Sequence, residues 1–100
     1  MKIYFEKLDK AFENRLRLQI MSVLVANQRY DFNSLKELLD ITDGNLASHL
    51  KGLEKEEYIL VNKSFLGRKP NTNYEATEKG KKAFAAHLDA LEQIIKNNKN

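Results

Sequence analysis

The chain has 100 residues, of which 42% are apolar and 31% charged, with one proline and no cysteine. This length and balance fit one folded domain better than a disordered chain, while the absence of cysteine excludes disulfides, thiolate metal sites and cysteine nucleophiles. The first residues carry charges where a secretory signal needs an apolar stretch, and no apolar run reaches the length of a membrane span, so we expect a cytoplasmic protein with no membrane partner.

The net charge of +3 is too small to identify a nucleic-acid binder, but the charges are distributed unevenly. Residues 31–60 hold three basic and seven acidic residues, whereas residues 1–30 hold six basic and three acidic ones. Residues 61–76 and 77–100 each carry a surplus of two positive charges. A DNA-binding element within residues 31–60 must therefore turn its acidic side chains away from the DNA.

The first long helix is predicted to start after Asn14, whose side chain can cap it. Ahead of this helix, Leu8 and Phe12 lie four residues apart, with Asp9 between them. This spacing predicts a further helical turn or two, packed on the same core or on a partner. Inside the long helix the apolar residues follow the spacing i, i+4, i+7 and i+8, at Leu16, Ile20, Val23 and Leu24. We therefore expect this helix to be mostly buried.

Two short helices joined by a tight turn are predicted next. Asn33 or Ser34 can cap the first, and Thr42 is a good cap for the second. The first has an apolar edge at Leu35, Leu38 and Leu39, and the second has a buried stripe at Leu46, Leu50 and Leu53. Because the connection is short, the pair is predicted to form a helix-turn-helix.

A β-hairpin is predicted to follow. Residues 58–61 are rich in β-forming side chains and read as a strand that continues toward Ser64, with residues 72–76 as the returning strand. The glycine, proline and asparagine within residues 65–71 favour an irregular hairpin tip. Arg68 and Lys69 place two adjacent positive charges on that tip.

The last helix is predicted over residues 77–96, with Thr77 as its cap. Its apolar residues recur at spacings of four, three and four, as in a coiled-coil seam, at Phe84, Leu88, Leu91 and Ile95. A helix of about twenty residues spans about 30 Å, which is longer than a three-helix core can cover. We expect the excess to meet a partner, although the same seam is also compatible with covering the domain's own core.

These elements predict a mainly α protein with a small β-hairpin (α+β class), formed as one domain over residues 1–100 with its core at about 14–84. Their order resembles the winged helix-turn-helix regulators of the MarR and ArsR type, in particular the compact winged helix DNA-binding domain branch of bacterial regulators. The residues that carry the resemblance are RLRLQIMSVL, FNSLKELLDITDGNLASHLKGLEKEEYI, GRKPNTNY and TEKGKKAF.

The resemblance implies a dimeric transcriptional regulator, which represses or activates by occupying an operator. In such a protein the helix from Thr42 to about Lys55 enters the major groove, and the hairpin around Arg68 reaches a minor groove or its phosphates. The sequence departs from the family pattern at Glu57, where such domains usually have glycine, and at Asn71, where they often have a basic residue. If the left-handed backbone is kept at Glu57, it costs about 1 kcal/mol.

By position, the resemblance implies DNA contacts for polar residues of the third helix and of the hairpin. Asn45 can read adenine bidentately, Arg68 and Lys69 can neutralise phosphates, and Thr42 is alternatively just a cap. The predicted DNA-binding residues are Thr42, Asp43, Asn45, Ser48, His49, Lys51, Lys63, Arg68, Lys69, Asn71 and Thr72. The predicted dimerisation residues are Phe5, Leu8, Phe12, Phe84, Leu88, Leu91, Ile94 and Ile95.

The sequence nominates no enzyme site, metal or cofactor. Ser48 and His49 are neighbours on a helix and do not face each other, and the second histidine, His87, lies on a different helix. The expected partners are double-stranded DNA with a palindromic operator and a second copy of the chain, and no residue nominates a small-molecule effector. The alternative is a winged-helix protein-interaction module that uses the acidic middle segment, which salt-dependent DNA binding would distinguish.

Overall fold

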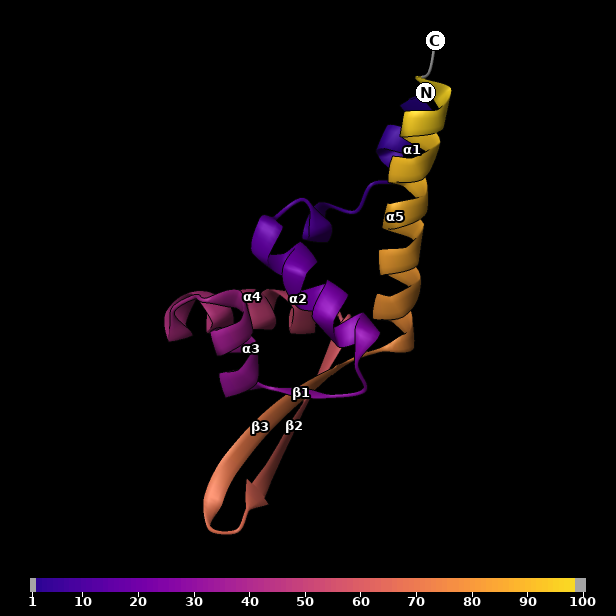
Figure 1. Ribbon diagram of the computed structural model, residues 1–100. Helices are drawn as coiled ribbons and strands as arrows, with labels where there is room; N and C mark the ends of the chain where they lie inside the picture. Colours follow the sequence, from indigo (N-terminus) through magenta and orange to yellow (C-terminus); the bar gives the residue numbers. More distant parts are fainter. Residues whose placement is uncertain (1, 99–100) are drawn as a thin grey trace.

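The computed structural model describes residues 2–98 as a helical domain with a three-stranded sheet (Figure 1). Met1, Lys99 and Asn100 belong to the predicted domain of residues 1–100 but lie outside the described residues. The mainly α, α+β class is confirmed. In chain order the elements are α1 (Lys2–Glu6), the 3₁₀ helix η1 (Lys10–Phe12), α2 (Arg15–Ala26), β1 (Tyr30–Asp31), α3 (Phe32–Leu39), α4 (Asp43–Lys55), β2 (Ile59–Leu66), β3 (Lys69–Ala76) and α5 (Glu78–Asn97).

Polar side chains fix where the main helices begin. Asn14, Thr42 and Thr77 accept hydrogen bonds from the first N–H groups of α2, α4 and α5, as the sequence predicts. The cap of α3 is different, because Asp31 rather than Asn33 or Ser34 holds this position. The extended backbone of Asp31 lets its carboxylate accept from the N–H of Ser34 at 2.6 Å, so α3 starts directly after β1.

The β2–β3 hairpin is longer and more regular than predicted. β3 lies between β1 and β2 and runs antiparallel to both. Leu66 pairs with Lys69, so the turn consists of Gly67 and Arg68. Gly67 has a φ of 66°, the positive value that a type II′ turn requires at its first central position. The predicted irregular tip over residues 65–71 is therefore wrong, since one glycine suffices to reverse the chain.

Pro70 lies inside β3 without breaking the ladder. It pairs with Phe65, the second pair from the turn. Pairs of an antiparallel hairpin alternate between hydrogen-bonded and non-hydrogen-bonded, and the second pair after a two-residue turn is of the non-bonded kind. The missing N–H of proline thus faces away from β2, and the strands continue to the tip.

The hydrophobic core lies where α2, α3 and α4 meet the base of the hairpin. Its fully buried side chains are Ile20, Met21, Leu24, Leu35, Leu46, Leu53 and Ile59. α5 joins this core by a close backbone approach at Gly80, where a Cβ would lie 2.1 Å from the carbonyl oxygen of Tyr58. The same oxygen accepts a hydrogen bond from Thr77 N at 3.0 Å. The start of α5 is therefore locked to the chain segment that follows α4.

Phe12 and Phe84 are core residues of this domain. Their ring centroids lie 5.4 Å apart in an edge-to-face arrangement, and Phe12 also stacks on Tyr58 at 5.4 Å. Phe12 is 2% exposed and Phe84 7% exposed. This corrects the prediction that the two rings face a second copy, because both fill the space between α5 and the rest of the domain and leave no area for a partner.

Asp9 ties the N-terminal segment to two other elements. One carboxylate oxygen caps η1 by accepting from Ala11 N at 2.9 Å, and the other accepts a hydrogen bond from the hydroxyl of Tyr58. The N–H of Asp9 donates to Nδ1 of the buried His87 on α5 at 2.9 Å. Burial and the Asp9 carboxylate raise the pKa of Tyr58 to about 12. The segment before α2 is thus anchored at both α5 and the end of α4.

The two ends of the molecule differ in shape. In Figure 1, α5 runs upright along one side and extends past α2, α3 and α4, with α1 packed beside its far end. The β2–β3 hairpin projects from the opposite end (Figure 1). No helix within residues 2–98 combines the length and the apolarity needed to cross a membrane.

Candidate nucleic-acid interface

The turn between α3 and α4 is held by backbone geometry. Asp40 has a left-handed backbone with a φ of 51°, and the N–H groups of Asp40 and Ile41 both donate to the carbonyl oxygen of Lys36. Thr42 then caps α4, because its hydroxyl oxygen accepts from Asn45 N at 3.2 Å. The hydroxyl of Thr42 is therefore engaged in the cap, which is the structural role that the sequence left open for it.

α4 presents an apolar and a polar face. Leu46, Leu50 and Leu53 are buried, as their helical spacing predicts. Three of the predicted contact residues, Asn45, Ser48 and Lys51, recur every three positions and are all exposed on the face turned away from the core. α4 therefore offers an uninterrupted row of hydrogen-bonding side chains to solvent.

Asp43 is also exposed, but its charge is compensated. Its carboxylate lies 2.8 Å from Nζ of Lys36 on α3. An exposed ion pair of this kind contributes little to stability. The pair matters for electrostatics, because the charge of Lys36 offsets the negative charge of Asp43 close to Asn45.

The remaining acidic residues of the middle segment mostly lie away from the start of α4. Glu54, Glu56 and Glu57 follow about ten residues after Asn45, which corresponds to about 15 Å along a helix. Asp31 is used as the cap of α3, and Glu37 is exposed on α3. Asp40 is the exception, because it is exposed in the turn and lines one hollow with Thr42 and Asn45. An anionic ligand at the N-terminal half of α4 therefore meets Asp40 and the Lys36–Asp43 pair, while Glu54, Glu56 and Glu57 lie farther along the chain.

The hairpin splits its predicted contact residues between a groove, an outer face and the tip. Lys63 and Thr72 face each other across β2 and β3 and line, with Lys51 of α4, a groove of about 530 Å³ between helix and hairpin. Asn71 pairs with Ser64 and so lies on the opposite face of the sheet. Arg68 and Lys69 are exposed at the tip. Lys51, Lys63 and Thr72 are therefore the predicted residues that the fold brings together.

His49 differs from the other predicted residues of α4 because it is half-buried against α2. Its Nδ1 accepts a hydrogen bond from Nε of Arg17 at 3.2 Å. Burial, and secondly the positive charge of Arg17, lower the pKa of His49 below its ordinary value. Arg17 was not among the residues predicted to belong to the site.

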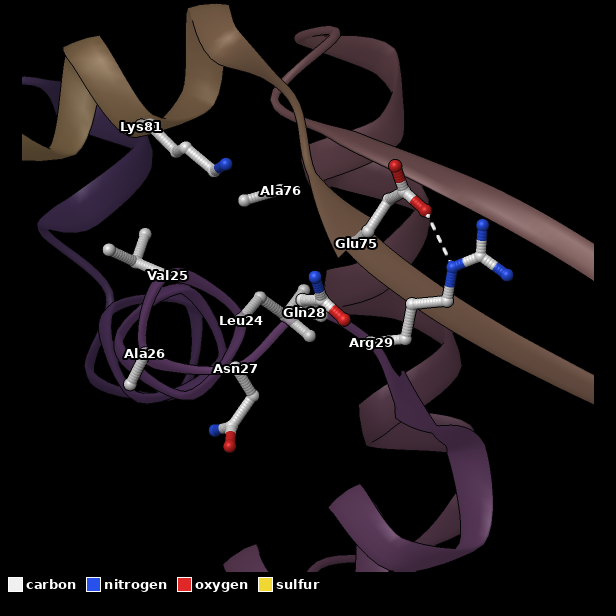
Figure 2. A pocket seen from close by; sticks show the side chains of 9 residues that line it. All are labelled: Leu24, Val25, Ala26, Asn27, Gln28, Arg29, Glu75, Ala76 and Lys81. Atoms are coloured by element: carbon white, nitrogen blue, oxygen red, sulfur yellow. Dashed lines mark hydrogen bonds and ion pairs between the residues drawn. The ribbon is translucent and has the colours of Figure 1, made fainter.

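A second hollow, of about 640 Å³, lies between the end of α2, β3 and the start of α5. Figure 2 shows Arg29 turned toward Glu75 within it, and the two side chains are 3.1 Å apart. The third charged residue of the lining, Lys81, pairs with Glu78 on its own helix. The charged groups that line this hollow are thus already paired.

Exposed apolar side chains lie on both α5 and α1, and we refer to those of α5 as the α5 stripe. Of the predicted dimerisation residues, Leu8 and Ile94 are half-buried. The α5 stripe consists of the exposed side chains Leu88, Leu91 and Ile95, while Ile3 and Phe5 are exposed on α1. Ile3 was missed by the sequence analysis, because it precedes any recognisable periodic run.

The chain is similar to known proteins in both sequence and structure. The family of winged helix DNA-binding domains matches residues 16–95. An uncharacterised protein of Methanocaldococcus jannaschii is 36% identical over 88 residues, covering 88% of this chain and 96% of that protein. A transcriptional regulator homologue from Pyrococcus horikoshii has a similar structure, with a TM-score of 0.87, 30% identity and 97% coverage of both chains.

The fold is also similar to that of S. aureus MepR, whose structure was determined as a complex with DNA. The TM-score is 0.74, at 19% identity, with 92% of this chain and 78% of that chain covered. At this identity the similarity concerns the fold alone. Together with the family match, it confirms the predicted winged helix-turn-helix architecture. Within residues 2–98 no group of three or more histidine and carboxylate side chains is placed to hold a metal ion.

Proposed function

The chain belongs to the family of winged helix DNA-binding domains, which are DNA-binding regulators rather than enzymes, and from this premise we propose that it is a sequence-specific regulator that binds its operator as a dimer. In this proposal α4 enters the major groove, and the β2–β3 hairpin lies along the adjacent backbone or minor groove. The single observation that carries it is the exposed polar row of Asn45, Ser48 and Lys51 beside a projecting basic hairpin.

The two parts of the interface have different roles. Amide, hydroxyl and ammonium groups on α4 are suited to base edges, with Asn45 matched to adenine and Lys51 to guanine. Arg68 and Lys69 are exposed at the hairpin tip and are suited to phosphates, whose neutralisation releases counterions. Lys63 and Thr72 line the groove between these parts and would bind the intervening backbone.

The proposed dimer rests on the α5 stripe. Leu88, Leu91 and Ile95 are exposed on a helix of 20 residues, which corresponds to a length of about 30 Å. α5 extends past α2, α3 and α4, and among residues 2–98 its far end has α1 packed beside it (Figure 1). A second copy related by a twofold axis would cover this surface and repeat α4 about 34 Å away, which implies a palindromic operator.

DNA binding is tested by selecting from random duplexes at two salt concentrations and sequencing what is retained. We expect a palindrome with half-sites about one helical turn apart, and weaker retention at the higher salt. Arg68→Ala combined with Lys69→Ala should weaken retention, whereas Lys81→Ala combined with Lys82→Ala, the matched pair on α5, should not. Failure to retain any duplex at low salt would contradict the proposal and favour a protein-interaction module.

The dimer is tested separately by sedimentation equilibrium. Leu91→Glu together with Ile95→Glu places two charges in the proposed interface, and we expect this variant to sediment as a monomer. Glu92→Gln with Lys96→Gln alters an exposed ion pair on the same helix and serves as the control. A wild-type chain that stays monomeric at micromolar concentrations would contradict the dimer.

A further inference from the structure

Arg17 and His49 form a contact between two helices that are far apart in the sequence. Nε of Arg17 on α2 donates to Nδ1 of His49 on α4 across 3.2 Å. A ring nitrogen that accepts a hydrogen bond carries no proton, so the proton of the neutral imidazole is on Nε2. The contact therefore selects one tautomer of a side chain on the DNA-binding helix.

Gly52 provides the space for this contact. A Cβ at position 52 would lie 2.4 Å from a terminal nitrogen of Arg17 and 2.6 Å from its Cζ. Glycine inside a helix is about 1 kcal/mol less favourable than alanine, and Gly52 does not have the positive φ that would require it. The glycine is thus explained by the guanidinium that lies against the helix one turn after His49.

Arg17 is the charged neighbour that acts on the ring. The residues one turn away on α4 are uncharged, namely Asn45, Leu46, Gly52 and Leu53. β2 packs on the other edge of α4, beside Ala47 and Glu54. Within residues 2–98, Arg17 is therefore the charge that adds to burial in disfavouring the imidazolium form of His49.

We propose that Arg17 is a positioning residue that holds His49 as a neutral donor, whose Nε2–H binds a hydrogen-bond acceptor of the DNA. This deepens the proposed function and rests on it. A neutral donor pairs with guanine O6 or N7, thymine O4 or a phosphate oxygen in one geometry. A protonated histidine would instead add a sequence-independent cation. Arg17 thus favours selectivity over general affinity.

The positioning is tested without DNA by following the His49 ring in a pH titration by NMR. Arg17→Gln should raise the pKa of His49, because a positive charge is removed. Arg15→Gln removes the same charge from an exposed position two residues earlier and should leave the titration unchanged. Identical titrations in the wild type and Arg17→Gln would overturn the proposal.

Gly52→Ala provides a second test that keeps the charge of Arg17. The new Cβ takes the place of the guanidinium, so the His49 titration should shift as in Arg17→Gln. Alanine is favourable in a helix, so the variant should fold. Circular dichroism checks this. A folded Gly52→Ala variant with a wild-type His49 titration would contradict the role given to Gly52.

The consequence for DNA is tested with a selected duplex at pH 6 and pH 8. In Arg17→Gln the slope of log affinity against log salt should be steeper at pH 6, by up to about one, because the histidine gains a charge. Two other proteins should show a smaller change in this slope between pH 8 and pH 6. They are the wild type and the double variant that carries both Arg17→Gln and His49→Gln. An equal change in the double variant would overturn the proposal. If the NMR shift occurs but no variant binds any duplex, the proposed function fails while the positioning of His49 stands.

The variant His49→Ala shows whether the hydrogen-bond acceptor is a base or a phosphate of the DNA. Loss of preference at one position of each half-site identifies a base, and weaker binding of every duplex by a similar factor identifies a phosphate. Both results support a donor at His49. Unchanged affinity and unchanged preference would overturn it.

Discussion

The two ends of α4 differ in how tightly they are packed. At the C-terminal end, Tyr58, Gly80 and Asp9 bring three segments into contact at distances that leave no room for a larger side chain. At the N-terminal end, a Cβ added to Gly44 would meet nothing within 4 Å, and the side chains of Asn45 and Ser48 are exposed. Packing within the domain therefore accounts for the residues at the C-terminal end of α4. The exposed polar residues at the N-terminal end are instead accounted for by binding to a partner. Four substitutions test how differently the two ends of α4 are packed.

Gly80→Ala should have the largest effect on stability. The added Cβ would lie 2.1 Å from the backbone oxygen of Tyr58, which cannot move without shifting the start of α5. We expect a loss of about 3 kcal/mol, at the upper end of ordinary overpacking. Urea unfolding measures it. A loss below about 0.5 kcal/mol would mean that the junction is not tightly packed.

Tyr58→Phe should cost about 2 kcal/mol near neutral pH, because a hydrogen bond to the Asp9 carboxylate is lost. The pKa of Tyr58 is raised to about 12 in the folded chain, against 10.0 for an ordinary tyrosine. The stability contributed by this hydroxyl is therefore fully present below pH 10 and lost as the pH rises toward 12. Unfolding of both proteins at pH 8 and pH 11 should show the difference between them shrinking, and a constant difference would contradict this reasoning.

Glu57→Gly should stabilise the chain by about 1 kcal/mol. Glu57 has a φ of 64°, and the N–H of Tyr58 donates to the carbonyl of Leu53 at 3.0 Å, so α4 ends in the left-handed motif in which glycine is favoured. Thermal unfolding gives the sign. Glu56→Gly, at a position with an ordinary φ of −74°, is the control and should not stabilise.

Gly44→Ala should have the smallest effect on stability, a gain of about 0.5 kcal/mol, because it lies in an exposed first turn with open space around it. Its effect on DNA affinity should have the opposite sign if the DNA approaches the backbone there. Unfolding and DNA-binding measurements on the same variant test this. An increase in both the free energy of unfolding and the affinity for DNA would mean that the DNA does not approach the backbone at Gly44.

Periodicity and capping made much of this fold predictable. The leucine stripe of α4 and the caps Asn14, Thr42 and Thr77 depend on residues close in sequence, which is why the sequence locates them. The burial of Phe12 depends on how α5 packs across the chain, which no local pattern encodes.

The candidate site was predictable to a similar extent. The exposed row on α4 and the basic hairpin tip follow from spacing and charge. The contact of Arg17 with His49 joins positions 32 residues apart and depends on how α2 crosses α4, so it was missed. Gly52 was the available signal, since a glycine inside a predicted helix calls for a steric explanation.

The central claim, that α4 reads bases while the hairpin tip binds the backbone, is tested most directly by repeating the duplex selection with Asn45→Ala and with Arg68→Ala combined with Lys69→Ala. The first variant should lose its preference at one position of each half-site, at a cost of about 1–3 kcal/mol for the preferred base. The second should keep the same preferred sequence and bind every duplex more weakly, with a smaller salt dependence. An unchanged sequence preference in Asn45→Ala, or an altered one in the hairpin variant, would contradict this division of roles.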